Sequence, residues 1–152
     1  EAEGVTVDGS TVTISEAGVY RLSGSFDGGV AVAAPDDALV VLILDGVDIS
    51  NDAGAAIAVQ SADHVAIFLE EGSDNTFSDA GSYTAEADAN AAIWADTDLT
   101  ISGTGSLTVT GNGTDGISST DDLAILSGEI AVTAADDALR GKDSLVVEAG
   151  TW

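Results

Sequence analysis

The sequence predicts an all-β fold, a right-handed parallel β-helix with about five three-faced coils of roughly 22 residues each. Three observations support this prediction. Equivalent apolar residues recur along the chain, apolar and polar residues alternate within short runs, and glycines interrupt these runs. Aromatic residues make up only 5% of the chain, so the core is expected to consist of narrow layers of small aliphatic side chains.

Two sets of aliphatic residues carry the repeat. The members of each set lie 24 and 22 residues apart, and the sets are Ile93, Ile117 and Leu139, and Leu99, Leu123 and Leu145. Two earlier coils fit with small insertions, and in them Val65 and Leu39 take the place of Leu99. A β-sandwich is the alternative, but it does not predict that corresponding positions recur at this interval. An amphipathic helix is excluded because the alternation has a period of two.

We expect residues 1–152 to form one domain. Residues 1–28 are predicted to form N-terminal strands, which include two short strands around a turn at Asp8 and Gly9. Residues 29–152 are predicted to form the coils, the last of them incomplete. Residues 79–90 depart from the repeat and are interpreted as an inserted loop.

The charge of the chain restricts its partners. The net charge is −24, with 27 acidic and three basic residues, which excludes nucleic acid and disfavours an anionic membrane. No apolar run is long enough to insert into a membrane. The remaining partners are cations, neutral glycans, and anionic glycans bridged by cations.

Stacked coils would bring acidic residues into columns. Two carboxylates about 5 Å apart repel by about 3 kcal/mol at an effective dielectric constant of about 20, so bound cations would stabilise the fold. Clustered carboxylates are the hard oxygen ligands that Ca²⁺ prefers, so we expect Ca²⁺ as a cofactor. The candidate ligands are Asp98, Asp115, Asp121, Asp122, Asp136, Asp137 and Asp143. A solvated acidic face, or adaptation to high salt, is the alternative.

Two further pairs of residues have candidate functions. Trp94 and Tyr83 are candidate glycan-binding residues, because aromatic rings stack on sugars and alternation points Trp94 outward. Alternatively, Trp94 packs under the inserted loop. Arg140 and Lys142 are interpreted as cations that neutralise Asp136, Asp137 and Asp143; a role as the base of a lyase is the less favoured alternative.

The ends of the predicted helix suggest self-association. A β-helix without caps presents open strand edges that pair with other chains. The chain is therefore either a cut fragment or a subunit that stacks end to end into a fibre. The residues predicted to mediate stacking are Val5, Val7, Val12, Ile14 and Trp152.

Four segments of the sequence resemble the bacterial carbohydrate-binding-domain proteins. They are residues 18–24 (GVYRLSG), 44–49 (LDGVDI), 122–128 (DLAILSG) and 136–143 (DDALRGKD). The resemblance implies a secreted right-handed β-helix similar in shape to pectate lyases. It also implies calcium sites and binding of plant or acidic polysaccharides, without established catalysis. The chain is shorter and more acidic than is usual for that family.

These observations lead to a ranked set of expected functions. The first is a non-enzymatic, calcium-supported adhesion or scaffold protein, extracellular or on the cell surface, that stacks into a filament. The second is a monomeric carbohydrate-binding module for plant or acidic polysaccharides. A polysaccharide lyase is the third and least favoured.

Overall fold

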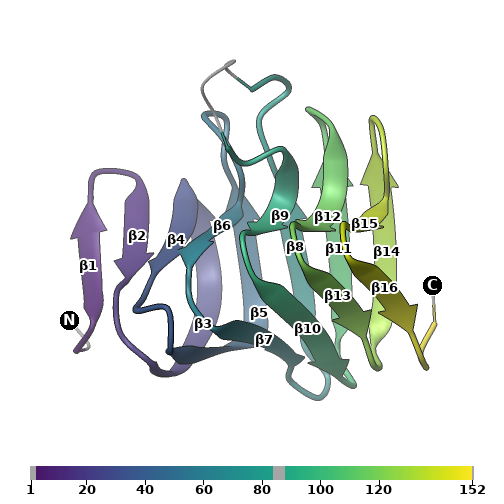
Figure 1. The fold of residues 1–152 in the computed structure, drawn as a ribbon. Coiled ribbons are helices and arrows are strands. Elements are labelled where there is room, and N and C mark those ends of the chain that lie inside the picture. The colour runs from purple at the N-terminus through teal and green to yellow at the C-terminus, as the bar shows by residue number, and fades with distance from the viewer. Residues whose placement is uncertain (1–2, 84–87, 152) are drawn as a thin grey trace.

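The computed structural model describes residues 3–83 and 88–151, and within these ranges every regular element is a β-strand. The chain winds into a parallel β-solenoid of about five turns, which confirms the predicted β-helix (Figure 1). The first and last strands lie at opposite ends of the solenoid. Within the same ranges, no helix is long and apolar enough to cross a membrane.

One face of the solenoid, here called face 1, is a seven-stranded sheet. Its strands, in order, are β1 (Val5–Asp8), β2 (Thr11–Ile14), β4 (Gly29–Ala33), β6 (Ile57–Ser61), β9 (Ala91–Ala95), β12 (Asp115–Ser119) and β15 (Leu139–Gly141). All neighbours in this sheet are parallel except β1 and β2, which form an antiparallel hairpin.

The other two faces belong to one larger sheet. Face 2 contains β7 (His64–Leu69), β10 (Asp98–Gly103), β13 (Asp122–Ile125) and β16 (Ser144–Val147). Face 3 contains β8 (Asp74–Ser78), β11 (Ser106–Gly111) and β14 (Glu129–Ala134). Two long strands, β3 (Gly18–Asp27) and β5 (Leu39–Ser50), run around the corner between these faces. The first part of β5 pairs with β7 and its last part with β8.

The core is built from the predicted columns of aliphatic residues. Ile93 pairs with Ile117, which pairs with Leu139, and the Leu99, Leu123 and Leu145 column has the same form. In the central coils these side chains are 0–1% exposed. Burying one such side chain stabilises the fold by about 1.5–3 kcal/mol, so regular stacking of aliphatic layers is the main stabilising interaction.

The predicted equivalence of Leu39 with Leu99 is wrong by one residue. Val40, which is fully buried, pairs with Val65, whereas Leu39 pairs with His64 and is 54% exposed. Because both residues are apolar, alternation alone does not tell which of them points inward.

The N-terminal hairpin corrects part of the predicted self-association surface. β1 and β2 are joined at Gly9, whose φ of 60° suits glycine in a tight turn. Ile14 is a core residue with 1% exposure, so its prediction as a contact for a second chain is wrong. Val5 and Val12 pack partly against the core, and Val7 is 53% exposed. Trp152 lies outside the described residues.

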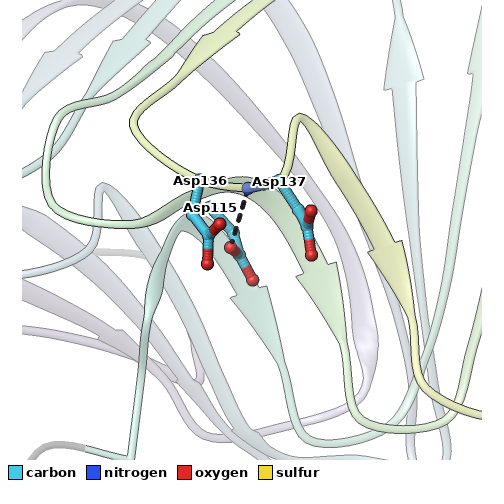
Figure 2. A group of neighbouring side chains, drawn as sticks. All are labelled: Asp115, Asp136 and Asp137. Atoms are coloured by element: carbon cyan, nitrogen blue, oxygen red, sulfur yellow. Dashed lines mark hydrogen bonds between the residues drawn. The ribbon is translucent and has the colours of Figure 1, made fainter.

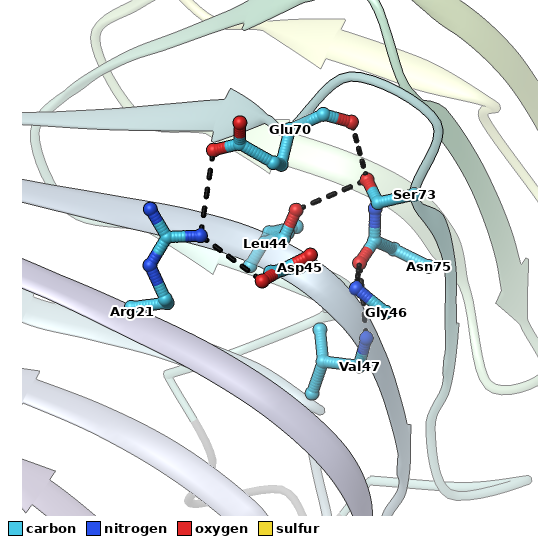
Figure 3. Close-up of polar contacts among 8 residues, drawn as sticks. All are labelled: Arg21, Leu44, Asp45, Gly46, Val47, Glu70, Ser73 and Asn75. Atoms are coloured by element: carbon cyan, nitrogen blue, oxygen red, sulfur yellow. Dashed lines mark hydrogen bonds and ion pairs between the residues drawn. The ribbon is translucent and has the colours of Figure 1, made fainter.

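A buried asparagine stabilises the bend in β5. Asn75 is 1% exposed and pairs in register with Leu107, in a column that is otherwise apolar. Its Oδ1 accepts hydrogen bonds from the backbone N–H groups of Gly46 and Val47, both at 3.0 Å (Figure 3). An apolar residue here would leave both donors without a partner, at a cost of about 1–3 kcal/mol each.

An exposed ion pair lies on the outside of the same corner. Arg21 Nη1 lies 3.0 Å from Asp45 Oδ2 and 3.5 Å from Glu70 Oε2 (Figure 3). The Arg21 side chain is 54% exposed. Exposed pairs contribute about 0–1 kcal/mol, so this contact adds little to stability.

Candidate functional site

Asp115, the first residue of β12, is a buried carboxylate. It is 1% exposed, and its backbone N–H donates to the Asn90 carbonyl at 3.1 Å. Its Oδ1 accepts a hydrogen bond from the backbone N–H of Asp137 at 3.2 Å. Its Oδ2 receives no hydrogen bond from any residue that the structure describes. A buried charged oxygen without a partner is costly, so a ligand at this atom would be stabilising.

Two exposed carboxylates from the next coil lie beside it. Each of Asp115, Asp136 and Asp137 offers one oxygen, and these oxygens lie within 4.8 Å of one another (Figure 2). We call these three residues the aspartate triad. The triad supplies the hard oxygen ligands that Ca²⁺ binds at about 2.3–2.6 Å, so its chemistry fits this ion.

Burial raises the pKa of the Asp115 carboxyl above its ordinary value. The Asp137 backbone N–H and the Arg140 guanidinium oppose this shift, while the charges of Asp137 and Asp136 add to it. Arg140 Nη1 lies 3.7 Å from Asp115 Oδ2, which makes an ion pair but is too long for a hydrogen bond. The triad is therefore only partly neutralised by the protein itself.

A groove runs along the outer side of face 1, next to the triad. Its volume is about 380 Å³, and its lining includes Trp94, Asp96, Ser118, Thr120, Arg140 and Lys142. These residues come from equivalent outward positions of successive coils, since Trp94 pairs with Ser118 and Ser118 with Arg140.

A second hollow continues the groove toward β6. It measures about 510 Å³, shares Asp88, Trp94 and Asp96 with the first, and adds Ala58 and Gln60. Together the two hollows offer an extended surface lined with hydroxyl, amide and charged groups.

The segment between β8 and β9 is fastened beside the triad. The Tyr83 hydroxyl donates to the Asp79 carboxylate and to the Ala91 carbonyl, the latter at 3.0 Å. Burial, followed by the Asp79 carboxylate, raises the pKa of Tyr83. A Cβ added at Gly113 would lie 2.6 Å from the Tyr83 ring, so only glycine lets the ring pack here. Tyr83 is half-buried and works as an anchor for this segment.

Comparison with known proteins identifies the family. The sequence profile described as "Carbohydrate-binding domain-containing protein" matches residues 8–152. The chain belongs to this family. A curated protein of that name from Acetivibrio thermocellus is 39% identical over 137 residues, which are 87% of this chain and 48% of that protein.

A solved structure with a similar fold is described as the polysaccharide lyase-like protein from C. thermocellum, gadolinium derivative. It is 37% identical, with a TM-score of 0.95 over 99% of this chain and 62% of that chain. The chain thus spans about half the length of the curated relative and less than two thirds of the solved one.

For this family, the position of Trp94 is of direct interest. The expectation that Trp94 is an exposed ring is wrong, because it is only 6% exposed. Its ring points away from the core, as alternation predicted, but Asp88 and Ala89 of the segment between β8 and β9 line the same hollow. The alternative of packing under this segment therefore describes Trp94 better, and little of the side chain is left exposed to the groove.

The seven predicted metal ligands separate into two groups. Asp115, Asp136 and Asp137 meet in the triad, at the start of strands on face 1. The other four lie past the opposite end of the face 1 strands, where the chain turns from face 1 to face 2. They are Asp98, Asp121, Asp122 and Asp143. We call these four the acid ladder. In the ladder the Asp122 backbone N–H donates to Asp98 Oδ1 at 3.1 Å, and Ser144 Oγ donates to Asp122 Oδ1 at 2.7 Å.

Other contacts and residues of the site were not predicted. Arg140 pairs with Asp115 instead of neutralising Asp136, Asp137 or Asp143, and Lys142 makes no ion pair within the described part of the chain. Asp96, Ser118 and Thr120 of the groove were not singled out. The register could have found Ser118, because it stands in one column with Trp94 and Arg140.

Proposed function

We propose that this chain is a non-catalytic carbohydrate-binding β-helix that binds a polysaccharide along the groove on face 1. The observation that carries the proposal is the gathering of Trp94, the Ser118 and Thr120 side chains, Asp96 and two cations on one outward surface. Sugars are bound by such mixtures of hydrogen-bonding groups with an aromatic edge. Membership of the carbohydrate-binding family supports the same ligand class.

The binding experiment compares two outward threonines. Thr120→Val removes a hydroxyl from the groove, and Thr108→Val removes one from face 3, where Thr108 is exposed. With plant and acidic polysaccharides in affinity electrophoresis, we expect Thr120→Val to bind about 3–10-fold more weakly and Thr108→Val to bind like the unmodified chain. Equal binding by both variants would place the ligand elsewhere.

We further propose that Ca²⁺ binds at the aspartate triad and stabilises the last coils. The support is the unpartnered Asp115 Oδ2 within a set of three carboxylates. The related solved structure is of a gadolinium derivative, and gadolinium is a hard cation that also prefers oxygen ligands. A calcium titration that is monitored by calorimetry or by fluorescence tests the site directly. An extracellular or cell-surface location fits both ligands, and fractionation of the producing cells tests it.

Lyase chemistry is the competing function for the groove. The relative described as polysaccharide lyase-like raises it, and Arg140 beside Asp115 is the residue pair that could serve it. We favour binding without catalysis, because the family is described by carbohydrate binding. Appearance of unsaturated product from polygalacturonate, lost in Arg140→Ala, would establish the lyase instead.

An adhesive or scaffolding role through end-to-end stacking is a second candidate. It is favoured by the last strand, β16, in which Leu145, Val146 and Val147 are 43–44% exposed. Within the described residues, one edge of β16 and one edge of β1 have no paired strand. Electron microscopy with Ca²⁺ and with chelator tests stacking: filaments that disperse in chelator support it, and single particles in both conditions reject it.

A further inference from the structure

Arg140 belongs to two sites at once. Its place in β15 puts it in the outward column with Ser118 and Trp94, on the floor of the groove. Its guanidinium nevertheless reaches back to the triad, where Nη1 lies 3.7 Å from Asp115 Oδ2. Its side chain is 52% exposed, whereas that of Asp115 is 1% exposed. Of these two partners, only the arginine is free to move.

A cation in the triad would compete with this guanidinium. The Asp115 oxygen nearest to Arg140 is the one that receives no hydrogen bond within the described part of the chain, so it is the oxygen available to a metal ion. A Ca²⁺ at about 2.3–2.6 Å from that oxygen would stand close to Nη1, and the two positive charges would repel each other. Because Asp115 is held by Asn90 and Asp137, the arginine is the group that gives way.

The groove is where the displaced side chain would go. Arg140 and Lys142 are two of the three cationic residues of a chain with a net charge of −24, and both line the groove. A guanidinium released from Asp115 can bind a carboxylate or sulfate through two parallel N–H bonds. Before its release, the arginine in the groove is paired with Asp115. After its release, the groove contains a guanidinium that is free to bind an anion.

We infer that Arg140 couples the two sites, so that a cation in the aspartate triad strengthens binding of anionic saccharides in the groove. This inference rests on the proposed function. By linkage, an anionic saccharide raises the affinity for the cation by the same factor, which is typically 5–150-fold for coupled sites. A neutral saccharide makes no differential contact with Arg140, so it is expected to show no coupling.

The first test uses Ca²⁺ alone, by isothermal titration at fixed ionic strength. Arg140→Gln removes the competing charge and is expected to bind Ca²⁺ at least 5-fold more tightly. Lys142→Gln is the matched control, since it removes one positive charge from the same groove without touching Asp115, and its affinity is expected to change less than about 2-fold. Unchanged or weaker Ca²⁺ binding in Arg140→Gln overturns the inference. Arg140→Lys keeps the charge and reports on folding if Arg140→Gln is unstable.

The second test adds a saccharide of known charge. With an oligogalacturonate, the unmodified chain is expected to bind at least 5-fold more tightly in Ca²⁺ than in chelator, and Arg140→Gln to lose this difference. A cello-oligosaccharide of equal length is expected to bind alike in both conditions. Equal coupling in Arg140→Gln, or coupling with the neutral sugar, overturns the inference. If neither sugar binds in either condition, the proposed function fails instead, and the first test still decides the competition at Asp115.

Discussion

Similar acidic residues lie at the two ends of the last face 1 strands, but their surroundings differ. In the aspartate triad, Asp115 is buried and one of its oxygens has no hydrogen-bond partner within the described residues. In the acid ladder, by contrast, Asp98 and Asp122 both accept hydrogen bonds, and Asp98 is half-buried while Asp122 is exposed. The difference teaches that burial, and not the column of carboxylates alone, leaves a carboxylate oxygen without a partner.

The strongest test of this comparison removes one carboxylate from each region. Asp115→Asn is expected to abolish stabilisation by Ca²⁺, whereas Asp122→Asn is expected to retain it. A site saturated 100-fold above its Kd stabilises the fold by about 2.7 kcal/mol, which thermal unfolding with and without Ca²⁺ detects easily. Loss of the Ca²⁺ effect in Asp122→Asn would move the cation to the acid ladder.

The packing beside the triad is tested by two glycines. Gly113→Ala brings a Cβ to 2.6 Å from the Tyr83 ring and 2.8 Å from the Ala80 carbonyl oxygen, so we expect a loss of about 1–3 kcal/mol in the free energy of unfolding. Gly81→Ala, in the same segment as Tyr83, meets no atom within 4 Å and is expected to be nearly neutral. Chemical denaturation measures both, and equal stability of the two variants would mean that the Tyr83 anchor is unimportant.

Alkaline pH tests the same anchor in another way. Because burial raises the pKa of Tyr83 above its ordinary value of 10.0, the folded chain keeps a proton that the unfolded chain releases. This stabilising contribution is complete below pH 10.0 and is lost as the pH rises further. The free energy of unfolding should therefore fall less steeply with rising pH in Tyr83→Phe. The two slopes should differ by the equivalent of up to one proton. An unchanged slope would contradict the buried position of the hydroxyl.

The smallest effect is expected in the acid ladder. Desolvation and the charges of Asp98 and Asp143 raise the pKa of Asp121. Asp121 is only half-buried and makes no ion pair within the described residues, so replacing it by asparagine should change the free energy of unfolding by no more than about 0.5 kcal/mol. Low salt should enlarge the change, because less screening strengthens the repulsion that is removed. A large loss of stability would show that the ladder also binds a cation.

The stacking of the coils could be predicted from the sequence because the core repeats. Leu99, Leu123 and Leu145 are large aliphatic residues at intervals of 24 and 22 residues, and only a winding chain places them on one another. The same stacking places Asp115 opposite Ala91, at the start of β12. It failed at Leu39, where two adjacent apolar residues make the inward position ambiguous.

The details of the candidate site could not be predicted, because they depend on segments outside the repeat. Trp94 does point outward, but the segment that covers it has no counterpart in the other coils. The unpartnered oxygen of Asp115 follows from the turn that contains Asp136 and Asp137, whose path the period does not specify. Likewise, no sequence pattern indicates that the long side chain of Arg140 bends back toward Asp115.

The continuous strands β3 and β5 have a consequence for how such a chain can vary. In the first two coils the backbone passes the corner between faces 2 and 3 without leaving the sheet. In later coils it leaves the sheet at residues 70–73, 104–105 and 126–128. An added residue at those three places only lengthens a turn, whereas at the continuous corner it has to be absorbed as a bulge within the sheet, as the shift in pairing between Leu22 and Gly24 of β3 shows. Natural length differences and engineered insertions at this corner should therefore occur in the later coils, where a tag or a second module can be carried without disturbing the winding.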